Sequence, residues 1–169
     1  VPLPRRLVAA AAIGLSTRFA ASADAVIAPS ALIRNELTAR GVRTPIAVVP
    51  TGVDLLHFAP GDSAAARRAL GLAAEDRVLL YVGRLDREKS VGRILAAFER
   101  VTGTVPRARL VLAGHGTEAE ALRRQARALP VGDRIVFLGA RPHDALVECY
   151  RAADLFVFAS ETETQGLVL

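Results

Sequence analysis

Short apolar runs rich in β-branched residues alternate along the chain with segments whose apolar residues recur at helical spacing. The runs are continuously apolar, which is typical of parallel strands covered on both faces. They lie at residues 25–28, 46–49, 77–82, 109–113, 134–138 and 155–159. Repeated strand–helix–strand units give a doubly wound sheet. This alternation restricts the fold more than any other feature, and it predicts an α/β protein with a parallel sheet.

Helices are predicted in the longer intervals between these runs. One covers residues 90–103, and another covers residues 143–152. A third starts at Thr117, because Thr117 and Glu120 have the spacing of a capping box. Asp154 is interpreted as a cap or turn residue, and His57 and His143 as structural residues.

The composition is that of a folded protein and argues against one class of partner. Of the 169 residues, 51% are apolar and 23% are charged, which is enough for a sizeable core. The net charge of +5 indicates either a phosphate-rich partner or an arginine-rich surface. No basic run exceeds two residues and aromatic residues make up 5%, so nucleic-acid binding is disfavoured.

Cys149 is the sole cysteine, which excludes an internal disulfide and a cluster of thiol ligands for zinc. A buried structural thiol in a reducing cytoplasm is expected. The apolar stretch 7–15 is shorter than the roughly 20 residues that span a bilayer. The sequence has no methionine and ends inside an apolar run, so we expect further sequence at both ends.

A change of domain is predicted near residue 50. The segment 50–54 has turn chemistry, and the segment 58–61 adds a second cluster of proline and glycine. We therefore expect residues 1–50 to be the end of one lobe and residues 51–61 to be a linker. Residues 62–169 would then form most of a second, Rossmann-like lobe.

The loops that follow the strands of the second lobe carry the candidate binding groups. In open α/β sheets, ligands bind beyond the carboxyl ends of the strands. Glycines at the strand exits let a ligand approach the backbone closely. The candidates are Gly83 and Arg84 after the run 77–82, Gly114, His115 and Gly116 after the run 109–113, and Arg141 after the run 134–138. With the carboxylates and hydroxyls of residues 160–164, these groups suit a ligand that has a diphosphate and a polyol.

Lys89 is the sole lysine among 22 basic residues. Lysine is a compact point charge whereas arginine is a planar fork, so Lys89 suits a contact with one phosphate oxygen. The loop from Gly114 to Gly116 has two readings. It is either a phosphate cradle at a helix start or a tight turn, because Glu118 and Glu120 already bring negative charge there.

Several short motifs occur in a fixed order. They are Pro-Thr-Gly-Val-Asp at 50–54 with Phe58, Gly-Arg-Leu at 83–85 with Glu88 and Lys89, and Ser160 with Glu163 and Gly-Leu-Val at 166–168. Together they resemble glycosyltransferase family 4, whose members are retaining enzymes of the two-lobe GT-B architecture. The resemblance covers residues 22–169. It implies that this chain holds the end of the N-terminal acceptor lobe and most of the C-terminal donor-binding lobe.

The resemblance also assigns roles to individual residues. It implies that Arg84 and Lys89 bind the donor diphosphate and that Glu163 contacts the donor sugar as the first residue of a Glu-x7-Glu pair. The second glutamate would fall beyond Leu169. Gly166 and the backbone that follows it would approach the phosphates, and the loop ending at Arg141 would lie near the base.

The motif around Glu163 departs from the usual family pattern. Gln165 stands where the family often has an aromatic residue. The variant that ends in Gly166 and Leu167 is similar to that of enzymes that glucosylate diacylglycerol, which indicates a lipid acceptor. The basic segment at the start of the chain would then rest on an anionic membrane, or it packs within the first lobe.

The implied function is transfer of a hexose, with retention, from a UDP-glucose-like or GDP-mannose-like donor to an acceptor hydroxyl. The partners would be a nucleotide sugar and a sugar or glycerolipid acceptor, without a cofactor or metal. We expect a cytoplasmic protein, with peripheral attachment to the plasma membrane as an open alternative, and we expect the 169-residue chain alone to be inactive. A sugar-nucleotide epimerase, a phosphorylase and a non-catalytic nucleotide-binding module remain alternatives.

Overall fold

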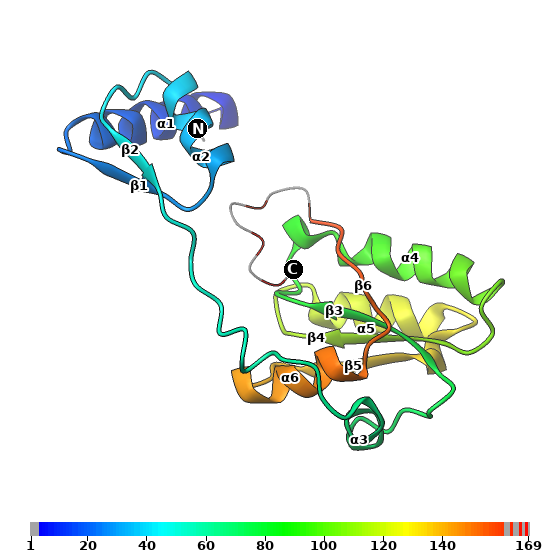
Figure 1. Ribbon diagram of the computed structural model, residues 1–169. Helices are drawn as coiled ribbons and strands as arrows, with labels where there is room; N and C mark the ends of the chain where they lie inside the picture. The colour runs from blue at the N-terminus through cyan, green and yellow to red at the C-terminus, as the bar shows by residue number, and fades with distance from the viewer. Residues whose placement is uncertain (1–3, 161–162, 164–165, 167, 169) are drawn as a thin grey trace. The chain divides into compact units, whose positions relative to one another are not determined.

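The computed structural model describes residues 4–160 together with Glu163, Gly166 and Val168 (Figure 1). The chain forms two compact units, of which the first is built mainly on Val1–Val53 and the second mainly on Asp54–Glu163. Among the residues that the structure describes, no helix is both long and apolar enough to cross a membrane.

The first unit contains a β-α-β element preceded by a long helix. Helix α1 (Arg5–Ala21) leads into strand β1 (Val26–Ala28), helix α2 (Ala31–Ala39) and strand β2 (Ile46–Val48). The two strands pair in parallel, with Val26 opposite Ile46. Helix α2 starts at a good N-cap, because the Ser30 hydroxyl accepts a hydrogen bond from the backbone N–H of Ile33.

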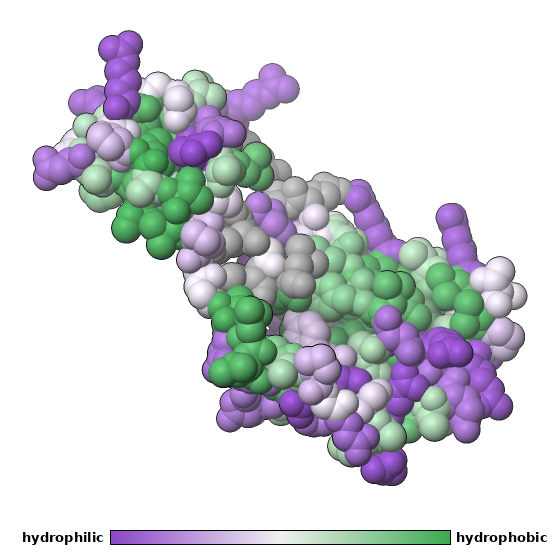
Figure 2. Space-filling model, in the orientation of Figure 1, coloured by the Kyte–Doolittle hydropathy of each residue, from purple (hydrophilic) through white to green (hydrophobic). Residues whose placement is uncertain are grey.

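The first unit leaves much apolar surface exposed. Figure 2 shows hydrophobic residues gathered on the visible face of this unit. Its exposed large apolar side chains include Leu7, Val8, Ile13, Leu15, Phe19, Ile27 and Leu32. Exposed apolar area of this kind suits a covering protein surface or a membrane surface. Both interpretations of the basic segment at the start of the chain therefore stay predictions.

The second unit is a doubly wound parallel sheet. Helix α3 (Ser63–Ala69) precedes strand β3 (Arg77–Val82), and the short η1 turn (Arg87–Lys89) leads into helix α4 (Val91–Thr102). Then follow strand β4 (Ala108–Ala113), helix α5 (Ala119–Ala128), the η2 turn (Gly132–Arg134), strand β5 (Ile135–Gly139), helix α6 (His143–Ala152) and strand β6 (Leu155–Phe156).

The strand order is β5-β4-β3-β6, and all pairs are parallel. Alternate residues of β3 face opposite sides of the sheet. Tyr81 belongs to a buried cluster with Leu95 and Phe98 of α4 and with α5, whereas Leu80 belongs to a second cluster with α3 and Cys149 of α6. The α/β fold and the parallel sheet predicted from the apolar runs are therefore confirmed.

Two predictions about element boundaries are corrected. Helix α5 begins at Ala119 rather than Thr117, and no side chain caps it. Thr117 does not close a capping box because its hydroxyl and its backbone N–H both donate to Asp86 in another loop. Regular pairing of β6 with β3 ends at Phe156 rather than at residue 159, although the N–H of Val157 still donates to the carbonyl of Leu80 at 2.8 Å.

Asp154 is structural, in agreement with the interpretation from the sequence. Its carboxylate accepts hydrogen bonds from the backbone N–H of Val78 at 2.7 Å and from the buried Arg67 side chain at 2.8 Å. Arg67 also donates to the carbonyl oxygens of Ala74 and Ala152. These bonds join α3, the start of β3 and the segment before β6, and so help to hold β6 beside β3.

Candidate functional site

Three loops are joined side by side at the carboxyl edge of the second unit's sheet. The N–H of Gly83 donates to the carbonyl of Ala113 at 3.0 Å, and the N–H of Gly114 donates to that of Gly139 at 2.8 Å. The N–H of Leu85 donates to the carbonyl of His115 at 2.8 Å. Backbone hydrogen bonds between neighbouring chain segments thus continue past the ends of the strands and form a short ladder between the loops.

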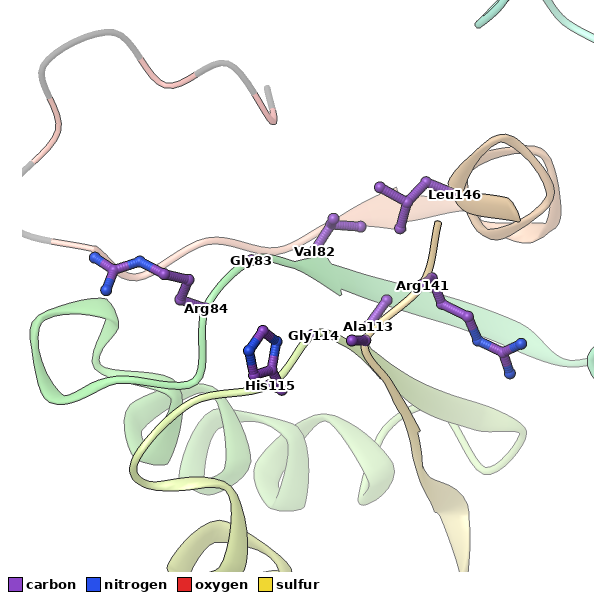
Figure 3. Close-up of a pocket in the computed structure, with 9 residues that line it drawn as sticks. Val82, Gly83, Arg84, Ala113, Gly114, His115, Arg141 and Leu146 are labelled. Atoms are coloured by element: carbon purple, nitrogen blue, oxygen red, sulfur yellow. The ribbon is translucent and has the colours of Figure 1, made fainter. Parts of the chain in front are cut away.

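A pocket of about 280 Å³ opens beside this ladder (Figure 3). Figure 3 shows the side chains of Arg84 and Arg141 extending away from each other on opposite sides of His115. The lining residues are Val82, Gly83, Arg84, Ala113, Gly114, His115, Ala140, Arg141 and Leu146. Five of the sequence candidates therefore line one pocket: Gly83, Arg84, Gly114, His115 and Arg141. Gly116 follows directly after His115 in the same loop.

Glycine is required at Gly114 and Gly116 by the packing of the loops themselves. A Cβ on Gly114 would lie 1.8 Å from the carbonyl oxygen of Gly83, and a Cβ on Gly116 would lie 2.5 Å from that of Leu85. Gly114 also has φ of +150°, which other residues rarely adopt. Loop packing alone thus accounts for both glycines, and their contact with a ligand stays a prediction.

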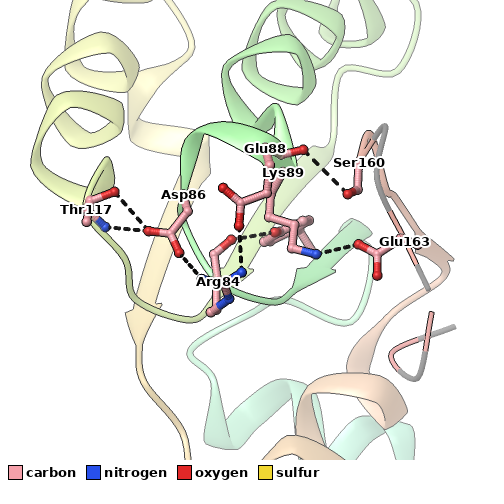
Figure 4. A network of polar contacts seen from close by, with 8 residues as sticks. Arg84, Asp86, Glu88, Lys89, Thr117, Ser160 and Glu163 are labelled. Carbon is pink, nitrogen blue, oxygen red and sulfur yellow. Dashed lines mark hydrogen bonds and ion pairs between the residues drawn. The ribbon is translucent and has the colours of Figure 1, made fainter. Parts of the chain in front are cut away.

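Arg84 is held by two carboxylates of its own loop (Figure 4). Its guanidinium donates to Asp86 Oδ2 and to Glu88 Oε1, each at 2.5 Å. The other oxygen of Asp86 accepts from the Thr117 N–H at 2.8 Å and from the Thr117 hydroxyl at 2.9 Å. These two bonds, followed by the charge of Arg84, hold the pKa of Asp86 below its usual value. Asp86 therefore stays ionised and ties the Arg84 loop to the start of α5.

Lys89 and Glu163 form an ion pair between the η1 turn and the loop after β6 (Figure 4). Their side chains are 15% and 28% exposed, so the pair is partly shielded from water. The hydrogen bond from Lys89 lowers the pKa of Glu163, and the charge of Arg84 acts in the same direction. The Lys89 ammonium also lies 6.0 Å from the centroid of the Phe158 ring. Two residues that lie 74 positions apart in the sequence therefore meet at one site.

Tyr81, Asp86 and Thr117 support the site in roles that the sequence alone does not predict. The buried Tyr81 hydroxyl donates to the carbonyl of Arg84 at 2.8 Å, and burial raises the pKa of Tyr81 to about 12. Tyr81 looks like one more core residue of an apolar strand, and no local pattern links Asp86 with Thr117, which is 31 residues away. Their roles become visible only when the loops are assembled.

The last candidates lie at the end of the chain. Gly166 has φ of +66°, a left-handed conformation that glycine adopts easily. Gln165 and Leu167 lie outside the described residues, so the predictions made for them stay untested. The hydroxyl of Tyr150 on α6 donates to the carbonyl of Val168 at 2.9 Å.

Two family models match the chain. The model described as "Glycosyl transferases group 1" matches residues 62–169, and the model described as "Glycosyltransferase Family 4" matches residues 1–56. A D-inositol 3-phosphate glycosyltransferase of Segniliparus rotundus is 38% identical over 154 residues, which are 88% of this chain and 34% of that protein. An alpha-monoglucosyldiacylglycerol synthase of Streptococcus pneumoniae is 34% identical over 149 residues, which are 85% of this chain and 34% of that protein.

Solved structures of similar fold agree with these matches. Sucrose-phosphate synthase (tll1590) from Thermosynechococcus elongatus superposes with a TM-score of 0.80 at 30% identity, over 92% of this chain and 40% of that one. Anabaena Alr3699/HepE in complex with UDP and glucose superposes with a TM-score of 0.77 at 26% identity, over 94% and 43%. These neighbours have the GT-B architecture, as predicted. The chain spans about a third of the length of the relatives it matches.

Proposed function

Because the chain belongs to the group 1 glycosyltransferases of family 4, we propose that it forms the donor-binding part of a retaining glycosyltransferase. The parent enzyme would move a hexose from a nucleotide-diphosphate sugar to an acceptor hydroxyl. The match of residues 62–169 to the family model supports this proposal, as does the similarity to a protein solved with UDP and glucose.

The observation that carries the proposal is the meeting of Lys89 and Glu163 beside Arg84 at the carboxyl edge of the sheet. Arg84 and Lys89 would bind the diphosphate, and Glu163 would hold the sugar hydroxyls. Lys89 and Glu163 are then partners of each other only until the donor arrives. A partly exposed ion pair contributes about 0–1 kcal/mol, so exchanging it for donor contacts costs little.

These charges suit the bond that has to break. When the bond between the anomeric carbon and the diphosphate oxygen breaks, negative charge accumulates on the departing nucleoside diphosphate. Fixed cations at that position stabilise the charge without having to reorganise. A guanidinium has five N–H donors, and the bonds from Arg84 to Asp86 and Glu88 use only two of them. The carboxylates of Asp86 and Glu88 would orient the Arg84 guanidinium, and its remaining N–H groups would be available to bind phosphate oxygens.

For the acceptor, we propose a hydroxyl on either an inositol phosphate or a membrane glycerolipid. The names of the two relatives support these two chemistries. The lipid alternative also implies contact with an anionic membrane, for which the exposed apolar side chains of α1, including Leu7, Leu15 and Phe19, offer a surface.

The experiment uses the full-length parent protein and measures nucleotide release. UDP-glucose, UDP-galactose and GDP-mannose are each supplied alone, with D-inositol 3-phosphate, and with diacylglycerol in anionic vesicles. Release that needs one donor and one acceptor supports the proposal and identifies both. Conversion of the donor without any acceptor would indicate an epimerase, and dependence on inorganic phosphate would indicate a phosphorylase.

Two variants test the assigned residues. Lys89→Met and Glu163→Gln keep the size of each side chain and remove its charge. Loss of a charge-assisted hydrogen bond of about 1.5–3 kcal/mol predicts a fall in kcat/KM of roughly 10- to 150-fold. Arg124→Ala on α5 is the matched control, because Arg124 is exposed and neither lines the pocket nor bonds to Arg84, Lys89 or Glu163. If the parent protein keeps full activity in both variants, the second unit would be a nucleotide-binding module that takes no part in catalysis.

A further inference from the structure

His57, His143 and Asp144 bring three metal-binding groups together outside the proposed donor site. His57 Nε2 lies 3.4 Å from Asp144 Oδ1, and His143 Nδ1 lies 4.0 Å from the same oxygen. Within the described part of the chain, one ligand atom from each residue lies within 4.8 Å of the other two. His57 comes from the segment that follows Asp54, whereas His143 and Asp144 form the first turn of α6.

Aromatic packing holds the two imidazole rings in place. The rings of His57 and His143 are stacked with centroids 5.1 Å apart and an angle of 12° between their planes. Phe58 contacts both rings edge-on, at 5.2 Å and 5.0 Å. Asp54 Oδ1 accepts a hydrogen bond from the backbone N–H of His57 at 3.0 Å and so fixes the turn that presents the ring. The His57 ring is therefore held in one position, whereas the more exposed His143 ring can turn to bring its nitrogen to an ion shared with His57.

One of these nitrogens lacks a hydrogen-bond partner. His57 Nε2 is buried and makes no hydrogen bond to any residue that the structure describes. A buried polar atom without a partner costs about 1–3 kcal/mol. The same nitrogen lies 3.4 Å from the Asp144 carboxylate oxygen, a spacing that leaves room for a shared cation. A cation at this point would satisfy both groups.

We propose that His57, His143 and Asp144 bind a divalent transition metal of the Zn²⁺ type. Two imidazole nitrogens and one carboxylate oxygen are the donor set that zinc accepts, whereas Mg²⁺ and Ca²⁺ prefer oxygen ligands alone. Zinc–ligand bonds of about 2.0–2.1 Å in a tetrahedron put ligand atoms about 3.3 Å apart. The pair of His57 and Asp144 already has this spacing, at 3.4 Å. His143 and Asp144 are 65% and 91% exposed, so their side chains can close the remaining distance.

The bound metal would be structural. It would fasten the start of the second unit to the first turn of α6, and His143 is two residues beyond Arg141 in the pocket wall. Occupancy would therefore stiffen the loop that carries Arg141. The site shares no residue with the cluster of Arg84, Lys89 and Glu163. Metal binding can therefore be tested independently of the proposed function.

The test is a metal titration of the full chain after treatment with a chelator. Zn²⁺ binding is measured by calorimetry, and Co²⁺ is used as a probe because its visible absorption reports the ligand geometry. We expect one Zn²⁺ per chain, and we expect His143→Ala and Asp144→Asn each to weaken binding by about tenfold or more. Both residues are exposed, so these variants should keep the fold. His115→Ala is the matched control, because it removes the third histidine of the chain from a different loop and should leave Zn²⁺ affinity unchanged.

Three outcomes would overturn the proposal. One is the absence of binding at about 0.1 mM Zn²⁺, which would mean that a proton or water alone satisfies His57. A second is binding that the His143→Ala and Asp144→Asn variants leave intact, because the metal would then lie elsewhere. Competition of Mg²⁺ with Zn²⁺ at similar concentration would also contradict a site with two nitrogen ligands.

Discussion

Replacing Gly114 by alanine should break the backbone ladder between the loops. The new Cβ would lie 1.8 Å from the carbonyl oxygen of Gly83 and 2.9 Å from its carbonyl carbon. Both are backbone atoms, so no side chain can rotate away. The N–H of Gly83 is itself bonded to Ala113, at the exit of the neighbouring strand. The clash therefore has to be relieved by moving one loop relative to the other.

The magnitude follows from two contributions. The φ of +150° at Gly114 is strained for alanine by about 1–3 kcal/mol. Real Cβ contacts are essentially never shorter than 3.0 Å, so the loops have to separate by about 1.2 Å. Overpacking of this kind adds about 1–3 kcal/mol. The unfolding free energy of the second unit should therefore fall by roughly 2–6 kcal/mol, a large part of the total for a small domain.

Gly139→Ala is the matched comparison. Gly139 also follows a strand and has φ of +72°, but no described heavy atom lies within 4 Å of a Cβ built there. Only the left-handed backbone conformation is strained, which predicts a loss of about 1–2 kcal/mol. The chain has two tyrosines and no tryptophan, and Tyr81 and Tyr150 both lie in the second unit. Tyrosine fluorescence during urea denaturation therefore reports this unit. Equal losses for the two variants would refute the packing argument.

Three further results are expected. Arg67→Met should lower the unfolding free energy by about 2–4 kcal/mol in the same assay, because three hydrogen bonds are lost and buried carbonyls are left unsatisfied; the exposed Arg68→Met should change it by less than about 0.5 kcal/mol. The pKa of Glu163 in the folded chain is lowered from its ordinary value of 4.5. The ionised carboxylate therefore stabilises the fold above pH 4.5, and this stabilisation is lost as the pH falls through the lowered pKa. Denaturation at a series of pH values should show a shallower acid loss for Glu163→Gln, and an identical profile would contradict the Lys89 pair. Cys149 is buried and its pKa is raised, so a thiol reagent should label it at least about 100-fold more slowly in the native chain than in urea, and rapid native labelling would argue against its burial.

Much of the second unit's fold follows from the sequence because its signals are local. The run at 77–82 coincides with β3, and the helix predicted over 143–152 coincides with α6. Errors occur where a tertiary contact overrides a local pattern. Thr117 has a capping sequence, but its hydroxyl bonds to Asp86 in the neighbouring loop instead. The end of β6 was predicted too late because Val157 to Ala159 remain apolar after regular strand pairing has stopped.

The candidate site could be predicted only in part. Parallel topology places all strand exits at one edge, so the neighbourhood of Arg84 and His115 follows from the strand assignment alone. The unusual lysine and the family motif identified Lys89 and Glu163, but nothing in the sequence states that these two residues pair with each other. Asp86 and the hydroxyl of Tyr81 escaped notice, because supporting residues are recognised by their partners in space rather than by sequence spacing.

The strand order also has a consequence for biosynthesis. Strand β6 pairs with β3, although it is made much later. The ribosome therefore makes Lys89, which follows β3, well before Glu163, which follows β6. Lys89 precedes Glu163 by 74 residues, which is about 4–15 s of translation at typical rates. During that interval the emerging sheet has β3 as an open edge and Lys89 lacks its carboxylate. The nascent chain therefore cannot form the pair of Lys89 and Glu163 until β6 and the loop after it have left the exit tunnel.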